Sequence, residues 1–154
     1  MTKNPEEGLL ISPIRNGTVI DHITAGEALS VLRILGITGT TRECLSVATN
    51  VKSCEGGLKD IVKVENRELK KNEVDRIALI APNATINIIR DFMVAEKKGV
   101  EIPSILVGVV RCTNPGCISN TNEPIETKFV VEEGGLRCLY CDNIITSGVA
   151  ELII

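Results

Sequence analysis

Residues 16–35 read NGTVIDHITAGEALSVLRIL and contain the first strand-to-helix step of the fold. The β-branched run Thr18–Ile23 predicts a strand, and Ala28–Leu35 places apolar side chains at helical spacing. Thr24 and Glu27 lie between them at the spacing of a capping box, in which each side chain binds the other residue's backbone amide. The stretch therefore predicts a strand that runs directly into a capped helix.

On the N-terminal side, the Asn16-Gly17 pair predicts a tight hairpin, because both turn positions of such a hairpin favour positive φ. The hairpin would join Gly8–Ile14 to Thr18–Ile23. Pro13 has no amide hydrogen to donate, so we expect Gly8–Ile14 to be an edge strand.

On the C-terminal side, the pattern predicts a helix at Lys71–Ile80 and strands at Glu43–Lys52, Lys59–Glu65 and Ala84–Glu96. The predicted order is ββαββαβ. Without its first edge strand this becomes βαββαβ, the ferredoxin-like plan of an antiparallel sheet with two helices on one face.

A polar stretch with Gly and Pro, Lys97–Pro103, is a predicted linker. It divides the chain into domains 1–102 and 103–154. No segment after Ile105 has helical spacing, so the second domain is expected to be all-β and the whole chain α+β.

Composition excludes several classes of protein. The 154 residues are 44% hydrophobic and 24% charged, which is enough apolar surface for a folded core. Three aromatic residues argue against base stacking on single-stranded nucleic acid, and a net charge of −3 argues against a basic nucleic-acid-binding body. The longest uncharged apolar run, Ile105–Val110, is too short to span a membrane.

Four of the six cysteines follow a metal-site spacing: Cys112, Cys117, Cys138 and Cys141 form C-x4-C, then 20 residues, then C-x2-C. Each short loop can turn two thiolates toward one point, which predicts a single zinc-ribbon-like structural Zn²⁺ site. Four thiolates close the coordination shell and leave no position for catalysis. The alternative is four unrelated buried cysteines or two redox-active pairs.

The beginning of the chain, MTKNPEEGLL, lacks the features of a signal peptide, so we expect a cytoplasmic protein with reduced thiols. That compartment favours metal binding over disulfides. Cys44 and Cys54 have no metal spacing and are expected to be ordinary thiols.

The first domain carries a scattered set of polar residues with no phosphate-binding loop: Asp21, His22, Lys59, Lys63, Asn87 and Lys97. Strand alternation places Lys59 and Lys63 on one face, where they could hold phosphates or simply be solvated. Alternation also places Asp21 and His22 on opposite faces, so Asp21 is not expected to orient His22.

Several blocks together resemble the regulatory chain of aspartate carbamoyltransferase. They are NGTVIDHI (16–23), KDIVKVEN (59–66), APNATIN (81–87) and the cysteine quartet with CISN (117–120), in the family's order and spacing. The resemblance implies a non-catalytic subunit whose first domain binds CTP or ATP, and UTP in some members. It also implies a zinc domain that docks on the catalytic chain, in an assembly of two catalytic trimers bridged by three regulatory dimers.

The resemblance also implies roles for particular residues. Asp21 and Lys63 fall at contacts to the ribose and nearby oxygens, and His22 and Lys97 fall at phosphate contacts. Ile14, Asn87, Ile89, Phe92 and Val94 fall along the base and ribose pocket, and Lys59 is a secondary candidate.

Three departures from a well-known enterobacterial member affect nucleotide preference: Ser12-Pro13 replaces an acidic residue and alanine, Phe92 replaces a tyrosine, and Lys98 follows Lys97.

Two other functions fit the sequence less well. A nucleic-acid-binding zinc ribbon needs a basic second domain, whereas residues 112–154 contain two basic and six acidic residues. A stand-alone enzyme is disfavoured by the closed thiolate site.

Overall fold

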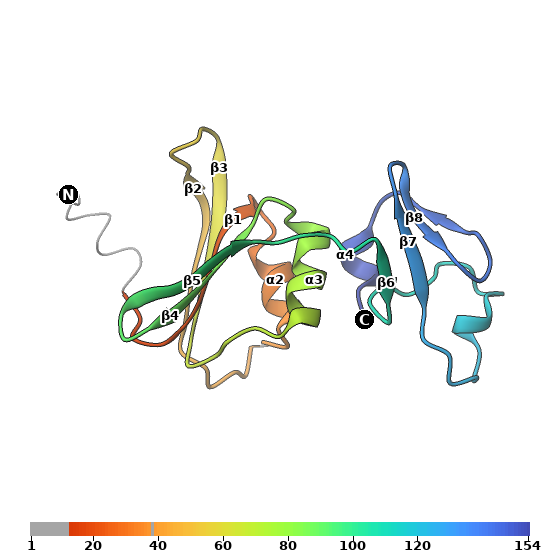
Figure 1. Cartoon of the computed structure of the whole chain (residues 1–154), viewed down its shortest axis with the longest axis horizontal. Helices are drawn as coiled ribbons and strands as arrows, with labels where there is room; N and C mark the ends of the chain where they lie inside the picture. The colour runs from red at the N-terminus through yellow and green to blue at the C-terminus, as the bar shows by residue number, and fades with distance from the viewer. Residues whose placement is uncertain (1–12, 38) are drawn as a thin grey trace. The chain divides into compact units, whose positions relative to one another are not determined.

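The computed structural model describes residues 13–37 and 39–154, and the chain divides into two compact units between Val100 and Glu101 (Figure 1). Among the described residues, no helix is long and apolar enough to cross a membrane.

In its described residues the first unit is a five-stranded antiparallel sheet with two helices. Its elements are β1 (Gly17–Thr24), α2 (Ala28–Ile34), β2 (Leu45–Lys52), β3 (Leu58–Glu65), α3 (Lys71–Ile80), β4 (Thr85–Arg90) and β5 (Met93–Gly99). The strand order is β2-β3-β1-β4-β5, and every neighbouring pair is antiparallel. The predicted α+β class and the ferredoxin-like βαββαβ order are confirmed, with β5 added at one edge.

Both helices lie on the same face of this sheet, as Figure 1 shows. The core beneath them is aliphatic: Ile20, Val62 and Ile86 from the strands pack with Val31 of α2 and Ile77 of α3, all at most 1% exposed. Alternation sends the intervening strand residues to the opposite face, which neither α2 nor α3 covers. Among the described residues this helix-free face carries several polar residues of the predicted nucleotide site.

The predicted N-terminal hairpin is wrong. Both edges of β1 are paired, one with β3 and the other with β4, so β1 has no free edge for Gly8–Ile14. Residues 8–12 lie outside the described part of the chain, and Pro13 and Ile14 are not in a strand.

The predicted strand Ala84–Glu96 is in fact two strands, β4 and β5. Asp91 and Phe92, at φ 51° and 64°, turn the chain between them. The predicted linker also begins too early, because Lys97–Gly99 belongs to β5.

The register shifts at three places in the sheet: once between β4 and β5 at Ile88–Ile89, and once on each side of β3. In β1 the register shifts between Ile20 and Ile23, with His22 at φ 56°. In β2 it shifts between Ala48 and Val51, with Asn50 at φ 54°. A bulge adds one residue to a strand and re-aims the side chains around it.

The second unit is a small antiparallel sheet in the order β6-β7-β8-β9. Its elements are β6 (Ile105–Val107), the 3₁₀ turn η1 (Ile118–Asn120), β7 (Lys128–Glu132), β8 (Gly135–Cys138), β9 (Ile144–Ile145) and α4 (Val149–Leu152). Phe129, Val110 and Leu106 are its most buried large side chains. The expectation of no helix is wrong in detail, since η1 and the single turn of α4 are helical.

Candidate functional site: a thiol cluster and a polar cleft

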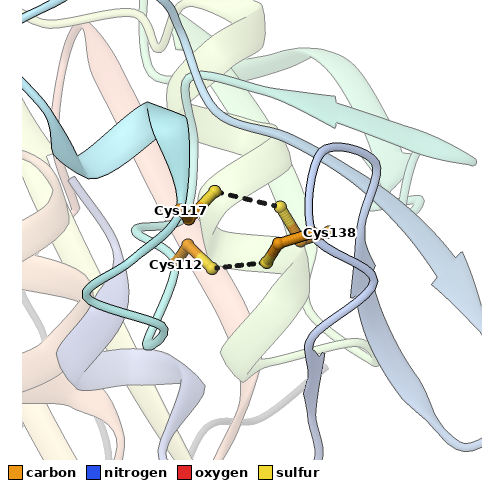
Figure 2. Close-up of side chains that lie close together, drawn as sticks. Cys112, Cys117 and Cys138 are labelled. Carbon is orange, nitrogen blue, oxygen red and sulfur yellow. Dashed lines mark hydrogen bonds between the residues drawn. The ribbon is translucent and has the colours of Figure 1, made fainter.

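The four predicted metal ligands lie together in the second unit. The Sγ atoms of Cys112, Cys117, Cys138 and Cys141 are all within 4.8 Å of one another. The Sγ–Sγ distance is 3.7 Å for both Cys112–Cys141 and Cys117–Cys138. Figure 2 shows Cys112, Cys117 and Cys138 pointing toward a common centre. A tetrahedron with Zn–S bonds of about 2.3 Å has edges of about 3.8 Å, so the cluster fits one tetrahedral Zn²⁺.

Hydrogen bonds from side-chain amides and from the backbone shape the two loops that carry the thiols. In the first loop, the side-chain amide Nδ2 of Asn120 donates to the backbone carbonyls of Cys112 and Asn114 at 2.9 and 2.7 Å. In the second, the Cys138 N–H donates to the Asn143 carbonyl at 2.8 Å. The side chain of Asn143 joins the loops by donating to Thr113 Oγ1 at 2.6 Å. The thiols are thus held by a network of uncharged groups.

Burial sets the protonation of this cluster. It raises the pKa of Cys112 to about 12 and also raises the pKa of Cys138. Hydrogen bonding, chiefly from the Asn114 side chain, lowers the pKa of the less buried Cys141 to about 7. Four thiolates at such short distances require a cation between them, and the cluster offers no protein cation. The donor set therefore suits a soft divalent metal bound for a structural purpose.

The first unit contains a polar cleft of about 750 Å³ where β1 and β3 meet the loops at their ends. Twelve residues line it: His22, Ile23, Thr24, Ala25, Ser53, Glu55, Gly56, Leu58, Lys59, Asn83, Thr85 and Lys97. Two of them, His22 and Lys97, are predicted phosphate contacts, and Lys59 is the secondary candidate. Sequence reasoning missed the hairpin residues, Ser53 and Glu55 among them.

The β1 bulge overturns the expectation that Asp21 and His22 face opposite sides. His22 Nε2 lies 3.8 Å from Asp21 Oδ2, and the His22 backbone N–H donates to Asp21 Oδ1 at 2.6 Å. Lys59 Nζ contacts the same carboxylate at 3.0 Å. Asp21 therefore holds an imidazole and an ammonium together at the cleft.

The remaining polar candidates form a row across the helix-free face. Val19 of β1 pairs with Lys63 on one side and Asn87 on the other, and Asn87 pairs with Lys97. The Asn87 amide donates to the Val19 carbonyl at 3.3 Å. Lys98, by contrast, pairs with Ile86 and so lies on the helix side of the strand. The register thus places Lys97, rather than Lys98, beside the cleft.

The apolar candidates lie toward the other end of the same strands. Ile89 pairs with Val94, beyond the Asn87–Lys97 pair as seen from the cleft. Phe92 is 65% exposed in the β4–β5 turn, and its N–H donates to the Arg15 carbonyl at 2.9 Å, beside the buried Ile14. The face therefore grades from an apolar end to a cationic end.

The chain was compared with known protein families. A model described as "Aspartate carbamoyltransferase regulatory chain, allosteric domain" matches residues 9–101. A second, described as the "metal binding domain" of the same chain, matches residues 104–151.

Curated relatives with the name "Aspartate carbamoyltransferase regulatory chain" are similar over almost the whole length. The protein of Methanoculleus marisnigri is 68% identical over 152 residues, which cover 99% of this chain and 98% of the relative. That of Methanosphaerula palustris is 67% identical and covers 96% of both chains. That of Haloarcula marismortui is 56% identical over 94% of this chain and 93% of its own.

Proposed function

The chain belongs to the family of aspartate carbamoyltransferase regulatory chains, and from this premise we propose that it controls the enzyme by binding a nucleotide in its first domain. It is a regulatory rather than a catalytic subunit, with an allosteric domain and a metal-binding domain. We take these domains as residues 1–102 and 103–154, and we place their action in the cytoplasm.

The proposed effectors are CTP and ATP, with UTP as a further candidate. The phosphates would lie at the cationic end, against His22, Lys59 and Lys97. The base would lie toward Ile14, Ile89, Phe92 and Val94, with Asp21, Lys63 and Asn87 between. The single observation that carries this is the grading of one sheet face from aliphatic residues to a lysine-lined cleft, which matches a molecule that is flat at one end and anionic at the other.

The proposed metal is one Zn²⁺ held by Cys112, Cys117, Cys138 and Cys141. Its chemistry there would be structural, because four thiolates complete its coordination. The shaped second unit would then dock on the catalytic chain, in a complex of two catalytic trimers bridged by three regulatory dimers. Binding of a nucleotide would favour one quaternary state, with a coupling typically of ~1–3 kcal/mol.

The test is reconstitution with catalytic trimers in the presence of zinc, followed by aspartate saturation curves with CTP or ATP. We expect a stable complex whose half-saturation for aspartate rises with CTP and falls with ATP. Lys63→Ala should assemble equally well but respond to CTP only at higher concentration. Failure to form a complex with zinc present would refute the regulatory assignment, and a complex indifferent to both nucleotides would refute the effector assignment.

A further inference from the structure

Asp60, the third residue of β3, is a fully buried carboxylate (0% exposed). Its Oδ2 accepts hydrogen bonds from the backbone N–H groups of Gly26 and Ala28, both at 2.9 Å. Its Oδ1 accepts from the N–H of Asn50 at 2.8 Å. One side chain thus binds three backbone amides from two segments that are far from it in sequence.

The Asn50 amide lies in one of the two bulges that flank β3, and the Gly26 and Ala28 amides lie where the chain leaves β1 for α2, shortly after the other bulge. Asp60 pairs with Ile23, the first residue after the β1 bulge. On the other side, β2 bulges opposite Asp60, and Asn50 is its residue of positive φ. Asparagine takes this conformation more readily than most non-glycine residues, but within a strand it persists only where its surroundings hold it. Asp60 supplies that hold for Asn50 directly.

The same two segments continue into two walls of the polar cleft. Ile23, Thr24 and Ala25 form one wall immediately before Gly26, and the β2–β3 hairpin, with Ser53 and Glu55, forms another shortly after Asn50. Lys59, which lines the cleft between them, precedes Asp60 in the chain. Resting on the proposed function, we propose that Asp60 is the positioning residue of the phosphate end of the cleft, tying both walls to β3 so that Lys59 and His22 face one bound triphosphate.

Asp60→Asn tests this in the full-length, zinc-loaded chain. The amide keeps the size of the carboxylate but replaces one acceptor oxygen by an N–H₂ donor, which must face at least one backbone N–H. We expect calorimetry to give CTP binding weaker by roughly tenfold, the equivalent of one hydrogen bond to a charged group. Cytidine, which has the same base and ribose without phosphates, should lose much less. A change in the CTP-to-cytidine affinity ratio is the readout that general destabilisation does not move.

Asp75→Asn is the matched control, because Asp75 makes a surface ion pair with Lys71 on α3 and has no contact with the cleft. Asp75→Asn should leave the CTP-to-cytidine affinity ratio unchanged. Amide hydrogen exchange supplies a direct measure: Asp60→Asn should speed exchange at Gly26, Ala28 or Asn50. The Asn66 amide, which donates to the Asn16 carbonyl, should be unaffected.

Each combination of exchange and affinity results either supports or overturns the positioning role of Asp60. Faster exchange with an unchanged affinity ratio would make Asp60 a purely structural residue and overturn the proposal, as would no change in either measure. Failure of the wild-type chain to bind CTP would refute the proposed function and this inference with it. If Asp60→Asn does not fold, CTP must slow exchange at Gly26 and Asn50 of the wild type more than cytidine does, and equal protection would overturn the proposal.

Discussion

Replacing Cys138 with serine removes one corner of the thiol cluster. The Cys138 side chain is 0% exposed, and its Sγ lies 3.7 Å from that of Cys117. A serine hydroxyl does not ionise at neutral pH, so three thiolates would remain where a tetrahedral Zn²⁺ needs four ligands. We expect the zinc content to fall from one ion per chain to near zero.

The magnitude follows from linkage between metal binding and folding. A ligand that binds only the folded state stabilises it by about 4 kcal/mol at a thousandfold excess over its Kd. With an apparent zinc-binding free energy of ~10 kcal/mol, that excess is reached at a free zinc concentration on the order of 50 µM. Small domains shift in Tm by roughly 4–8 °C per kcal/mol. Loss of the metal should therefore lower the Tm of the second unit by at least ~15 °C.

Tyr140 makes this measurable, because it is the only tyrosine and the chain has no tryptophan. It follows Leu139 beside the cluster, and its hydroxyl donates to the Glu126 carbonyl at 3.0 Å. Tyrosine fluorescence during heating thus reports on the second unit alone. Cys44→Ser is the matched control, since Cys44 is an exposed thiol outside the cluster. A Cys138→Ser chain that keeps one zinc and an unchanged fluorescence midpoint would refute the reasoning.

Lys97→Ala should weaken CTP binding by about tenfold while Lys98→Ala changes it little, because of these two lysines only Lys97 lines the cleft. Equal losses of CTP affinity in the two variants, measured by calorimetry, would contradict this placement of the two lysines. Zinc uptake at pH 7 should release protons and weaken as pH falls, because burial raises the pKa of Cys112 to about 12 and that of Cys138 as well. Uptake heats that do not depend on the buffer's ionisation enthalpy would oppose this. Gly17→Ala should lower the free energy of unfolding by about 2–3 kcal/mol, since the added Cβ would lie 2.1 Å from the Val64 carbonyl oxygen. An unchanged midpoint of denaturant unfolding would contradict this expectation.

Periodicity predicted most of the fold because the core is aliphatic and alternates cleanly. Val62 and Val64 face the helices, while Lys59 and Lys63 face away from them. The β4–β5 turn was missed because Asp91 and Phe92 take positive φ without glycine or asparagine, so the apolar pattern runs through it. The residue types at these positions therefore gave no signal for a turn.

The capping of α2 was also missed, for a different reason. No side chain at its N-terminus caps it locally, contrary to the capping box expected from Thr24 and Glu27. Asp60, 32 residues further along, accepts the Ala28 N–H instead. Sequence spacing reveals only partners that are close in the chain, so it did not indicate that the carboxylate of Asp60 caps α2.

Spacing alone predicted the four cysteines as a cluster, because two short loops can bring thiols together whatever lies between them. The polar cleft was predicted only in pieces. Its hairpin wall, with Ser53 and Glu55, carries no motif, and the approach of His22 to Asp21 depends on a bulge that alternation alone does not reveal.

That bulge gives β1 a fixed count of residues. Ile20 and Ile23 both enter the core although three positions separate them, which a regular strand does not allow. Deleting either Asp21 or His22 would restore regular alternation and leave Ile23 in the core opposite Asp60, but it would remove the extra residue that brings the His22 imidazole to the Asp21 carboxylate. A deletion in the exposed hairpin tip at residues 55–57 would shift no core residue. A change of chain length at the rim of the cleft is therefore expected to be tolerated, whereas a deletion at the bulge is expected to keep the core and abolish the contact between Asp21 and His22.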